Sequence, residues 1–207
     1  SINDIYARKV LAKDNQGFVN VSPSGGMNLE TVEPIYLGKT TPDFTMGWNN
    51  NFTYKNFGLS FLINARVGGI VTSSTQALLD RFGVSKASAD ARDAGGVMIP
   101  NQGLYDAKKY YTLVATGEND LAGYYTYSAT NVRLQELTFS YKFNSRLFNN
   151  VIKDLTLSFV ATNPWMIYCK APFDPELTAS TGTYGQGNDY FMQPSLKSYG
   201  FSVKFKF

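Results

Sequence analysis

The chain has few residues that could carry out covalent chemistry. It contains one cysteine, Cys169, and no histidine. A Ser–His–Asp triad, a Cys–His pair and a Cys/His zinc site are therefore excluded. The most suggestive carboxylate pair is Asp174 and Glu176, but catalysis would need a further group at a suitable distance, which the sequence does not indicate. We expect no catalytic residue, no cofactor, no metal and an inert Cys169 near the end of a strand.

The segment around Pro175 has a simpler interpretation. Proline fixes the backbone φ angle, and the flanking acids Asp174 and Glu176 can accept hydrogen bonds from N–H groups of the loop. We therefore predict that Asp174, Pro175 and Glu176 structure this loop. A calcium site that adds Asp189 as a third oxygen ligand is the alternative.

Aromatic side chains among polar residues form a second candidate set. Sugars and peptides are bound by apolar faces together with a few directed polar groups. The candidates for contact with a ligand, or with a protein that covers the loops, are Tyr105, Tyr110, Tyr111, Tyr124, Tyr125, Tyr184 and Tyr190. Packing of loop against loop would explain these tyrosines equally well.

Five segments show the alternation of β-strands, whose successive side chains point to opposite sides. In the last one, apolar side chains from Tyr199 to Phe207 alternate with Gly200, Ser202, Lys204 and Lys206. The others are residues 44–54, 59–67, 137–143 and 155–162. Such strands have about the nine to eleven residues that a tilted strand needs to cross a bilayer. Val132 and Leu134 are out of phase with 137–143, which predicts a β-bulge near Gln135, unless the polar-looking face is locally apolar.

Short and long connections alternate between these segments. The short ones are a turn at residues 55–58 and a polar link at 144–154, whereas the other two contain the long segments 73–127 and 170–194. Outer-membrane barrels have short periplasmic turns and long extracellular loops. In the first long segment, Ser73 and Ser74 predict the cap of a short helix at 76–82 that stops at Gly83. Residues 84–123 show no clear period, and residues 10–21 predict a hairpin.

The composition excludes other classes. Hydrophobic residues make up 43% and charged residues 17% of the chain, which has a net charge of +3 and no basic run. Nucleic-acid binding is therefore not expected. No apolar run reaches the roughly 18 residues of a membrane helix. The first residues lack the apolar core of a signal peptide. We expect that signal upstream of Ser1, so the chain is interpreted as a C-terminal fragment.

Three stretches carry a family resemblance. They are YLGKTTPDFTMGW (36–48) leading into NNFTYKNF (50–57), ATNVRLQELTFSY (129–141), and TNPW (162–165) followed by FDPE (173–176) and Pro194. Their order and content resemble the C-terminal end of SusC/RagA-type TonB-dependent outer-membrane transporters. The resemblance covers residues 30–70 and 125–207, over half of the chain.

The resemblance implies an all-β fold: an antiparallel transmembrane β-barrel segment of about five C-terminal strands plus a hairpin, from a 22-stranded barrel with long extracellular loops. Residues 1–207 would be a C-terminal fragment of the barrel domain, with the plug domain upstream. The implied location is the Gram-negative outer membrane, with the C-terminus in the periplasm. The protein would import glycans or peptides rather than act as an enzyme.

The resemblance also implies partners. They are the rest of the barrel with its plug, a SusD-like lipoprotein, the TonB complex acting through the missing N-terminal part, an oligosaccharide or peptide substrate, and outer-membrane lipid. Barrels of this kind end in an aromatic residue used in assembly, which implies that role for Phe205 and Phe207. A passive porin shares the strand pattern, and a soluble all-β adhesin or carbohydrate-binding domain is the second alternative.

Overall fold

The computed structural model describes residues 4–7, 35–99, 103–115, 121–144, 154–177 and 186–206. The chain divides into two compact units. We call them the sheet unit (Pro42–Gly68, Ala129–Pro175 and Gln193–Phe207) and the loop unit (Ser1–Thr41, Gly69–Ser128 and Glu176–Met192).

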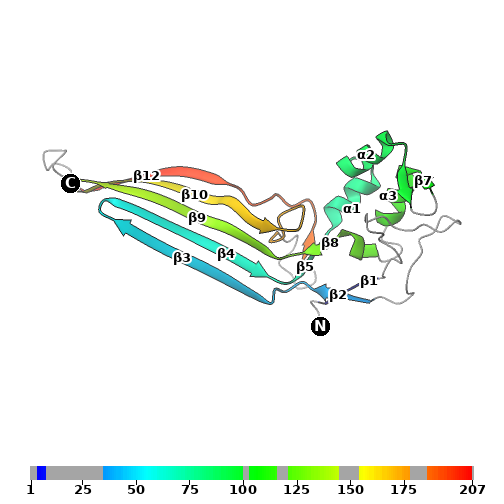
Figure 1. Cartoon of the computed structure of the whole chain (residues 1–207), viewed down its shortest axis with the longest axis horizontal. Helices are drawn as coiled ribbons and strands as arrows, with labels where there is room; N and C mark the ends of the chain where they lie inside the picture. Colours follow the sequence, from blue (N-terminus) through cyan, green and yellow to red (C-terminus); the bar gives the residue numbers. More distant parts are fainter. Residues whose placement is uncertain are drawn as a thin grey trace. The chain divides into compact units, whose positions relative to one another are not determined.

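The sheet unit is one antiparallel sheet of five strands in the order β12-β10-β9-β4-β3 (Figure 1). The strands are β3 (Phe44–Tyr54), β4 (Phe57–Val67), β9 (Asn131–Phe143), β10 (Asp154–Cys169) and β12 (Ser198–Lys206). The five predicted strands are therefore confirmed, although β9 and β10 extend beyond their predicted bounds. Alternation identified their centres because each strand has one apolar and one polar face.

The register brings the apolar side chains of all five strands onto one face. Phe52, Leu59, Phe139, Phe159 and Phe201 lie directly opposite one another from β3 to β12. A slip of one residue would move a whole strand's apolar side chains to the other face, so the hydrophobic pattern specifies this register.

The neighbouring line of residues shows the polar face. It consists of Thr53, Gly58, Ser140, Ser158 and Ser202, again one residue from each strand. A Cβ atom at Gly58 would lie 2.5 Å from the Oγ atom of Ser140, so a larger residue here would force the Ser140 hydroxyl to move. The sheet is therefore amphipathic across its full width.

A β-bulge explains how β4 and β9 stay in phase. Leu62 pairs with Glu136 and Ile63 pairs with Leu134, so Gln135 is the extra residue of a β-bulge. The predicted bulge is confirmed, and it returns Leu134 to the apolar face. The turn between β3 and β4 is tighter than predicted, because Tyr54 and Phe57 already pair.

The loop unit combines short helices with small sheets. Its helices are α1 (Ser74–Arg81), α2 (Lys86–Asp93), α3 (Ala107–Ala115) and the 3₁₀ helix η1 (Leu121–Tyr125). Its strands are β1 (Asp4–Ala7), β2 (Ile35–Lys39), β5 (Ile70–Ser73), β6 (Val97–Ile99), β7 (Gly103–Tyr105), β8 (Thr126–Ser128) and β11 (Asn188–Asp189). They form the sheets β1-β2, β11-β5-β8 and β6-β7.

The predicted helix near 76–82 is confirmed as α1, with Ser73 as its N-cap and Gly83 at a φ of 70° after its end. Residues 84–123, for which no period was found, contain α2, α3, β6 and β7. These elements have at most nine residues, too few for a clear period. The predicted hairpin at 10–21 lies outside the described residues.

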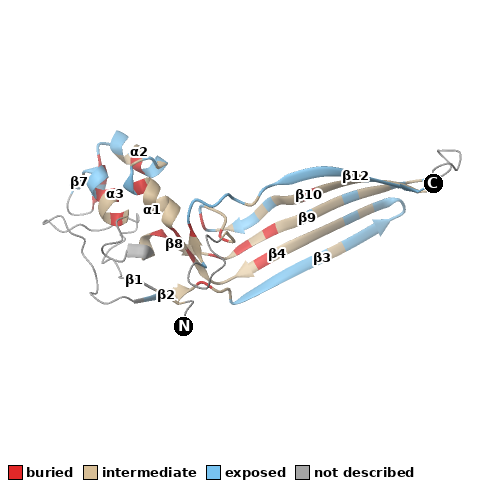
Figure 2. Ribbon diagram, turned by 180° about the vertical axis from the view of Figure 1, so that it is seen from behind, coloured by how far each residue is buried: buried red, intermediate tan, exposed pale blue. Residues whose placement is uncertain are grey.

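Burial differs between the two units (Figure 2). The core of the loop unit consists of Val97, Ile99, Ala107, Tyr110, Tyr111, Val114 and Tyr125. In the sheet unit, by contrast, many large apolar side chains are exposed. None of the described helices is long and apolar enough to cross a membrane.

Candidate functional site: an apolar sheet face and anchored loops

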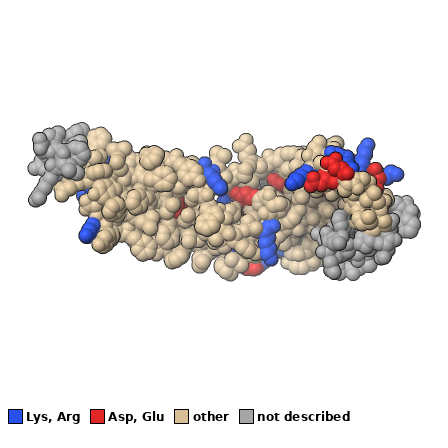
Figure 3. All heavy atoms as spheres, turned by 45° about the horizontal axis from the view of Figure 1, so that its top comes forward, with Lys and Arg blue, Asp and Glu red and all other residues tan. Residues whose placement is uncertain are grey.

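The apolar face of the sheet is a candidate contact surface. Phe52, Trp48, Val203 and Phe205 are each more than half exposed, and Phe201 is 86% exposed. Soluble monomers rarely expose an apolar surface of such extent. Figure 3 shows one side of the molecule, on which charged side chains are sparse over the sheet and gather over the helices. The apolar face of the sheet is chemically suited to contact lipid.

The opposite face carries small polar and charged side chains. Lys142 forms an ion pair with Asp154 at 2.7 Å, and both side chains are largely exposed. Lys204 and Lys206 lie on the same face of the neighbouring strand. A polar face opposite an apolar one is the arrangement of a barrel wall that has water inside and lipid outside.

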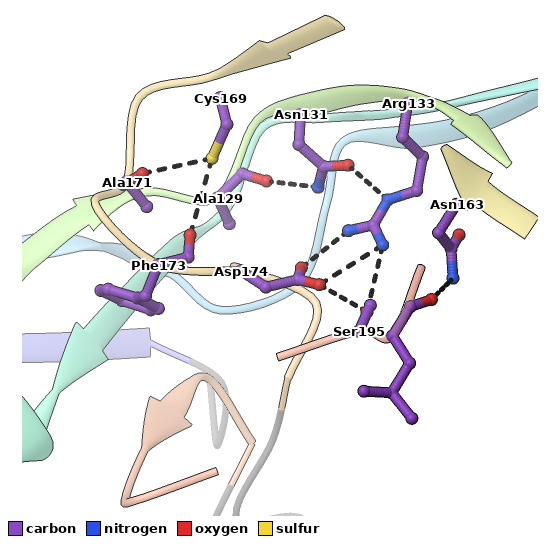
Figure 4. Close-up of polar contacts among 10 residues, drawn as sticks. Ala129, Asn131, Arg133, Asn163, Cys169, Ala171, Phe173, Asp174 and Ser195 are labelled. Atoms are coloured by element: carbon purple, nitrogen blue, oxygen red, sulfur yellow. Dashed lines mark hydrogen bonds and ion pairs between the residues drawn. The ribbon is translucent and has the colours of Figure 1, made fainter. Parts of the chain in front are cut away.

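A buried polar network surrounds Arg133 on this polar face (Figure 4). The Nη2 atom of Arg133 donates to Oδ1 of Asp174 at 2.7 Å, and Nη1 makes longer contacts with Oδ2 of Asp174 and Oγ of Ser195. Ser195 also donates to Asp174, and Nε of Arg133 lies 3.5 Å from Oδ1 of Asn131. Asn131 in turn donates to the carbonyl of Ala129.

The Arg133 network ties down the connection between β10 and β12. Asp174 and Ser195 belong to that connection and lie close to its two ends, while Arg133 belongs to β9. The side chains of Arg133 and Asp174 are only 6% and 7% exposed. Breaking one member of such a buried pair leaves an uncompensated charge. The network can therefore act as an anchor for both ends of this connection.

The middle of the same connection is held inside the loop unit. Oγ of Ser73 donates to Asp189 at 2.7 Å and accepts from the backbone N–H of Gln76. Ser74 donates to the side chain of Asn188 at 2.8 Å. Ser73 therefore caps α1 and also binds Asp189, while Ser74 binds the neighbouring Asn188.

Phe191 completes this attachment. Its backbone N–H donates to Oγ1 of Thr75 at 2.6 Å, and its φ of 50° is unusual for a residue other than glycine. Tyr190 and Phe191 have ring centroids 5.3 Å apart and are both more than half exposed. The segment thus presents two aromatic rings to solvent from a fixed backbone.

A tyrosine cluster fills the loop unit. The hydroxyl of Tyr125 donates to Oδ2 of the buried Asp80 at 3.0 Å. Burial, followed by the charge of Asp80, raises the pKa of Tyr111 to about 12. Burial likewise raises the pKa of Tyr124 and Tyr125 above the ordinary value. These tyrosines are therefore neutral at physiological pH.

The structure assigns different surroundings to the predicted ligand-contact tyrosines. Tyr110, Tyr111 and Tyr125 are buried in the core of the loop unit, and Tyr105 and Tyr124 pack against that core. Tyr190 is exposed. Tyr184 lies outside the described residues. Contact with a ligand stays a prediction for the group, and burial gives the first three a packing role in this structure.

The other predicted site residues also have definite places. Asp174 binds the side chains of Arg133 and Ser195, whereas loop N–H groups were the partners predicted from the sequence. Pro175 is buried. Loop structuring by Asp174, Pro175 and Glu176 stays a prediction.

The residues tied to metal binding, redox chemistry and assembly can also be located. No group of three or more His, Cys, Asp or Glu side chains in the described ranges could hold a metal. The thiol of Cys169 donates to the carbonyl oxygens of Ala171 and Phe173 at 3.4 and 3.7 Å (Figure 4). Phe205 is exposed on the apolar face, and Phe207 lies outside the described residues. Their role in assembly stays a prediction.

Sequence reasoning missed two residues of interest, Arg133 and Asp80. An arginine near the start of a strand that becomes buried signals a paired charge, because an unpaired buried charge is costly. The sequence does not name the partner, since Asp174 is 41 positions away. Asp80 gave no signal, because acids are common on short surface helices.

The comparisons with known proteins agree with this geometry. The chain matches no protein-family model. It is 26% identical over 189 residues to TonB-dependent receptor P3 of Formosa agariphila, a match that covers 88% of this chain and 18% of that protein. Two structures of the RagAB peptide importer are also similar. The open-open state has a TM-score of 0.66 at 16% identity, and the closed-closed state 0.62 at 14%.

The structural matches cover 98% of this chain but only 22% and 24% of those chains. The chain thus spans about a fifth of the length of the curated relative. At this identity the structural likeness shows the fold. The matched proteins are a receptor and importers, which agrees with the expectation that the chain is not an enzyme, and they support the predicted outer-membrane location. The comparisons confirm the resemblance found in the sequence, because the chain is similar to a part of a SusC/RagA-type TonB-dependent transporter and has the fold of its barrel wall.

Proposed function

We propose that the chain forms C-terminal strands and external loops of an outer-membrane importer, which takes up oligosaccharides or peptides with TonB-coupled energy. The observation that carries this proposal is the amphipathic sheet. One apolar line of side chains crosses all five strands, and a polar line runs beside it. β3 and β4 have eleven residues each and β12 has nine, about the length that a tilted strand needs in a bilayer.

The two edges of the sheet require completion. β3 and β12 are the outermost strands, and each has an edge that no other described strand pairs with. Unpaired backbone groups cannot face lipid, because nothing there satisfies their hydrogen bonds. Further strands of the barrel would pair with both edges, and a plug domain would fill its interior.

The lengths of the connections support a proposed orientation. β3 and β4 are joined by a tight turn, and β9 and β10 by a short link, at the same end of the sheet. Short turns are periplasmic in barrels of this kind. The connections β4–β9 and β10–β12 would then be extracellular, and the end of β12 would be periplasmic.

The partner and substrate are inferred from the relatives. RagAB is described as a peptide importer, which supports a peptide substrate, whereas the family resemblance leaves glycans equally open. A SusD-like lipoprotein would cover the extracellular loops. The exposed pair Tyr190 and Phe191 suits contact with such a lid or with substrate.

The proposal is tested by uptake in cells that express the complete protein. Labelled oligosaccharides and peptides should enter only when the TonB complex is intact and energised. Uptake that persists without TonB would indicate a passive porin instead. Extraction of the protein into buffer without detergent would contradict a barrel and favour the soluble alternative.

A further inference from the structure

A cavity in the loop unit has the chemistry of an anion-binding site. It measures about 120 Å³ and is lined by residues of α1, α2 and α3 and of the turn after α1. The lining residues are Asp80, Arg81, Phe82, Gly83, Ser88, Arg92, Ala107, Lys108 and Tyr111. Such a volume holds several water molecules, and so a carboxylate group with part of the residue that bears it.

The floor and the rim of this cavity differ. Asp80, Ser88, Ala107 and Tyr111 are buried, at 2%, 2%, 5% and 9% exposure. The basic residues Arg81, Arg92 and Lys108 are exposed at the rim. A ligand that enters from solvent therefore meets three cations before it reaches the floor.

The cations at the rim are not neutralised by ion pairs. Within the described part of the chain, neither Arg81 nor Lys108 has an acidic partner within ion-pair distance, and Arg92 uses Nη1 to donate to the carbonyl of Gly83. Asp80 contributes one negative charge to the floor. Three basic residues and one acid give the lining a formal net charge of +2.

The floor keeps an unused acceptor. Asp80 accepts from Tyr125 through Oδ2, but its Oδ1 atom is buried and has no hydrogen-bond partner among the described residues. Buried polar atoms are nearly always partnered, so an unpartnered one requires an explanation. A ligand with a hydroxyl or N–H group beside its carboxylate could bind both parts of the cavity. The carboxylate would contact the cations at the rim, and the hydroxyl or N–H group would donate to Oδ1 of Asp80, directly after a small side-chain movement or through a bridging water.

We propose that this cavity binds a carboxylate-bearing part of the imported substrate, with Arg81 and Lys108 as the residues that contact the acid. The inference rests on the proposed importer function and narrows its substrate to acidic molecules. A free peptide C-terminus has an N–H group beside its carboxylate, and an acidic sugar has hydroxyl groups beside its own. Both present the chemistry that the cavity fits.

The test uses the complete protein, purified in detergent, and isothermal titration calorimetry. The probes are a short peptide with a free C-terminus, the same peptide amidated, an oligogalacturonate, and its carboxyl-reduced neutral analogue. The variants are Arg81→Gln and Lys108→Gln, with Lys109→Gln as the matched control. Lys109 is the next residue on the same helix, is also basic and exposed, and does not line the cavity.

We expect the acidic member of one probe pair to bind more tightly than its neutral partner, and the pair that shows this identifies the source of the carboxylate. Arg81→Gln and Lys108→Gln should each weaken acidic binding about threefold to tenfold, the loss expected for one contact to a cation that stays exposed to solvent. Added salt should weaken acidic binding as well, because the cations are exposed. Neutral-probe binding and Lys109→Gln should be unaffected.

Two results would overturn the inference. One is equal binding of acidic and neutral probes to the unaltered protein. The other is an equal effect of Lys108→Gln and Lys109→Gln. The importer function would still hold if either result were found together with normal TonB-dependent uptake of a neutral substrate. If no TonB-dependent uptake of any substrate were found, the importer function itself would be refuted.

Discussion

Replacing Arg133 by methionine should destabilise the barrel wall much more than a comparable change at an exposed ion pair. Arg133 and Asp174 are both less than a tenth exposed, and they lie 2.7 Å apart. Removal of one partner from a buried pair typically costs about 3–5 kcal/mol, because the remaining charge stays buried without compensation. Asp174→Asn should show a loss of the same order, because the guanidinium is then left uncompensated.

The double variant R133M/D174L separates pairing from general disruption. Apolar groups that replace both members of a buried ion pair are often neutral or stabilising by about 1–4 kcal/mol. The double variant should therefore be more stable than either single variant. Lys142→Met is the matched control, because Lys142 pairs with Asp154 in the same sheet with both side chains largely exposed. That control should leave stability nearly unchanged.

Urea unfolding of the complete protein in detergent micelles, followed by tryptophan fluorescence, gives the stability losses. Limited proteolysis gives the local effect, since Asp174 and Ser195 hold both ends of the connection between β10 and β12. That connection should be cut faster in Arg133→Met and Asp174→Asn than in Lys142→Met. If the losses in the double variant equalled the sum of the single ones, or if Arg133→Met matched Lys142→Met, the anchor would be refuted.

The remaining predictions concern lipid contact, alkaline pH and topology. Val203→Arg should lower the free energy of unfolding by about 2–4 kcal/mol if Val203 lies near the bilayer midplane, whereas Lys204→Glu should leave folding nearly intact. Equal losses of unfolding free energy for both variants in urea would contradict the assignment of the lipid-facing and interior faces. Burial raises the pKa of Tyr125 above 10.0, so its contribution to stability is present below pH 10.0 and is lost as the pH rises through the folded-state value. Tyr125→Phe should remove that part of the alkaline loss in pH-dependent unfolding; an unchanged profile would refute it. In a cysteine-free background, a membrane-impermeant thiol reagent should label Gln186→Cys but not Asn144→Cys in intact cells, and the reverse pattern would invert the topology.

The strands of the sheet could be predicted because their two faces suit different surroundings. Lipid on one side and water on the other impose a period of two on every strand, and that period is visible in single sequences. The same pattern located the bulge at Gln135, since Val132 and Leu134 stay on the apolar face only if one residue is added. Ser73 was predictable as a helix cap because the requirement is local.

The anchors and the cavity were not predictable, because each depends on residues far apart in the sequence. Arg133 and Asp174 are 41 positions apart, and Ser73 and Asp189 are 116 positions apart. Neither pair follows a repeating pattern. α2 and α3 are too short for periodicity, so the position of Lys108 at a cavity could not be inferred from its neighbours.

This difference bears on where substrate specificity would lie in the proposed importer. The amphipathic pattern of β3 to β12 is needed for any outer-membrane barrel, so it cannot distinguish one imported substrate from another. Discrimination needs single side chains at fixed positions, and buried polar groups that a wrong ligand leaves unpaired. In the loop unit, Asp80 has an unpartnered oxygen, and Arg81 and Lys108 have no acidic partner within the described ranges. In the proposed importer, these residues are therefore better placed than the strands to select the substrate, and substrate choice should change with them while the sheet stays intact.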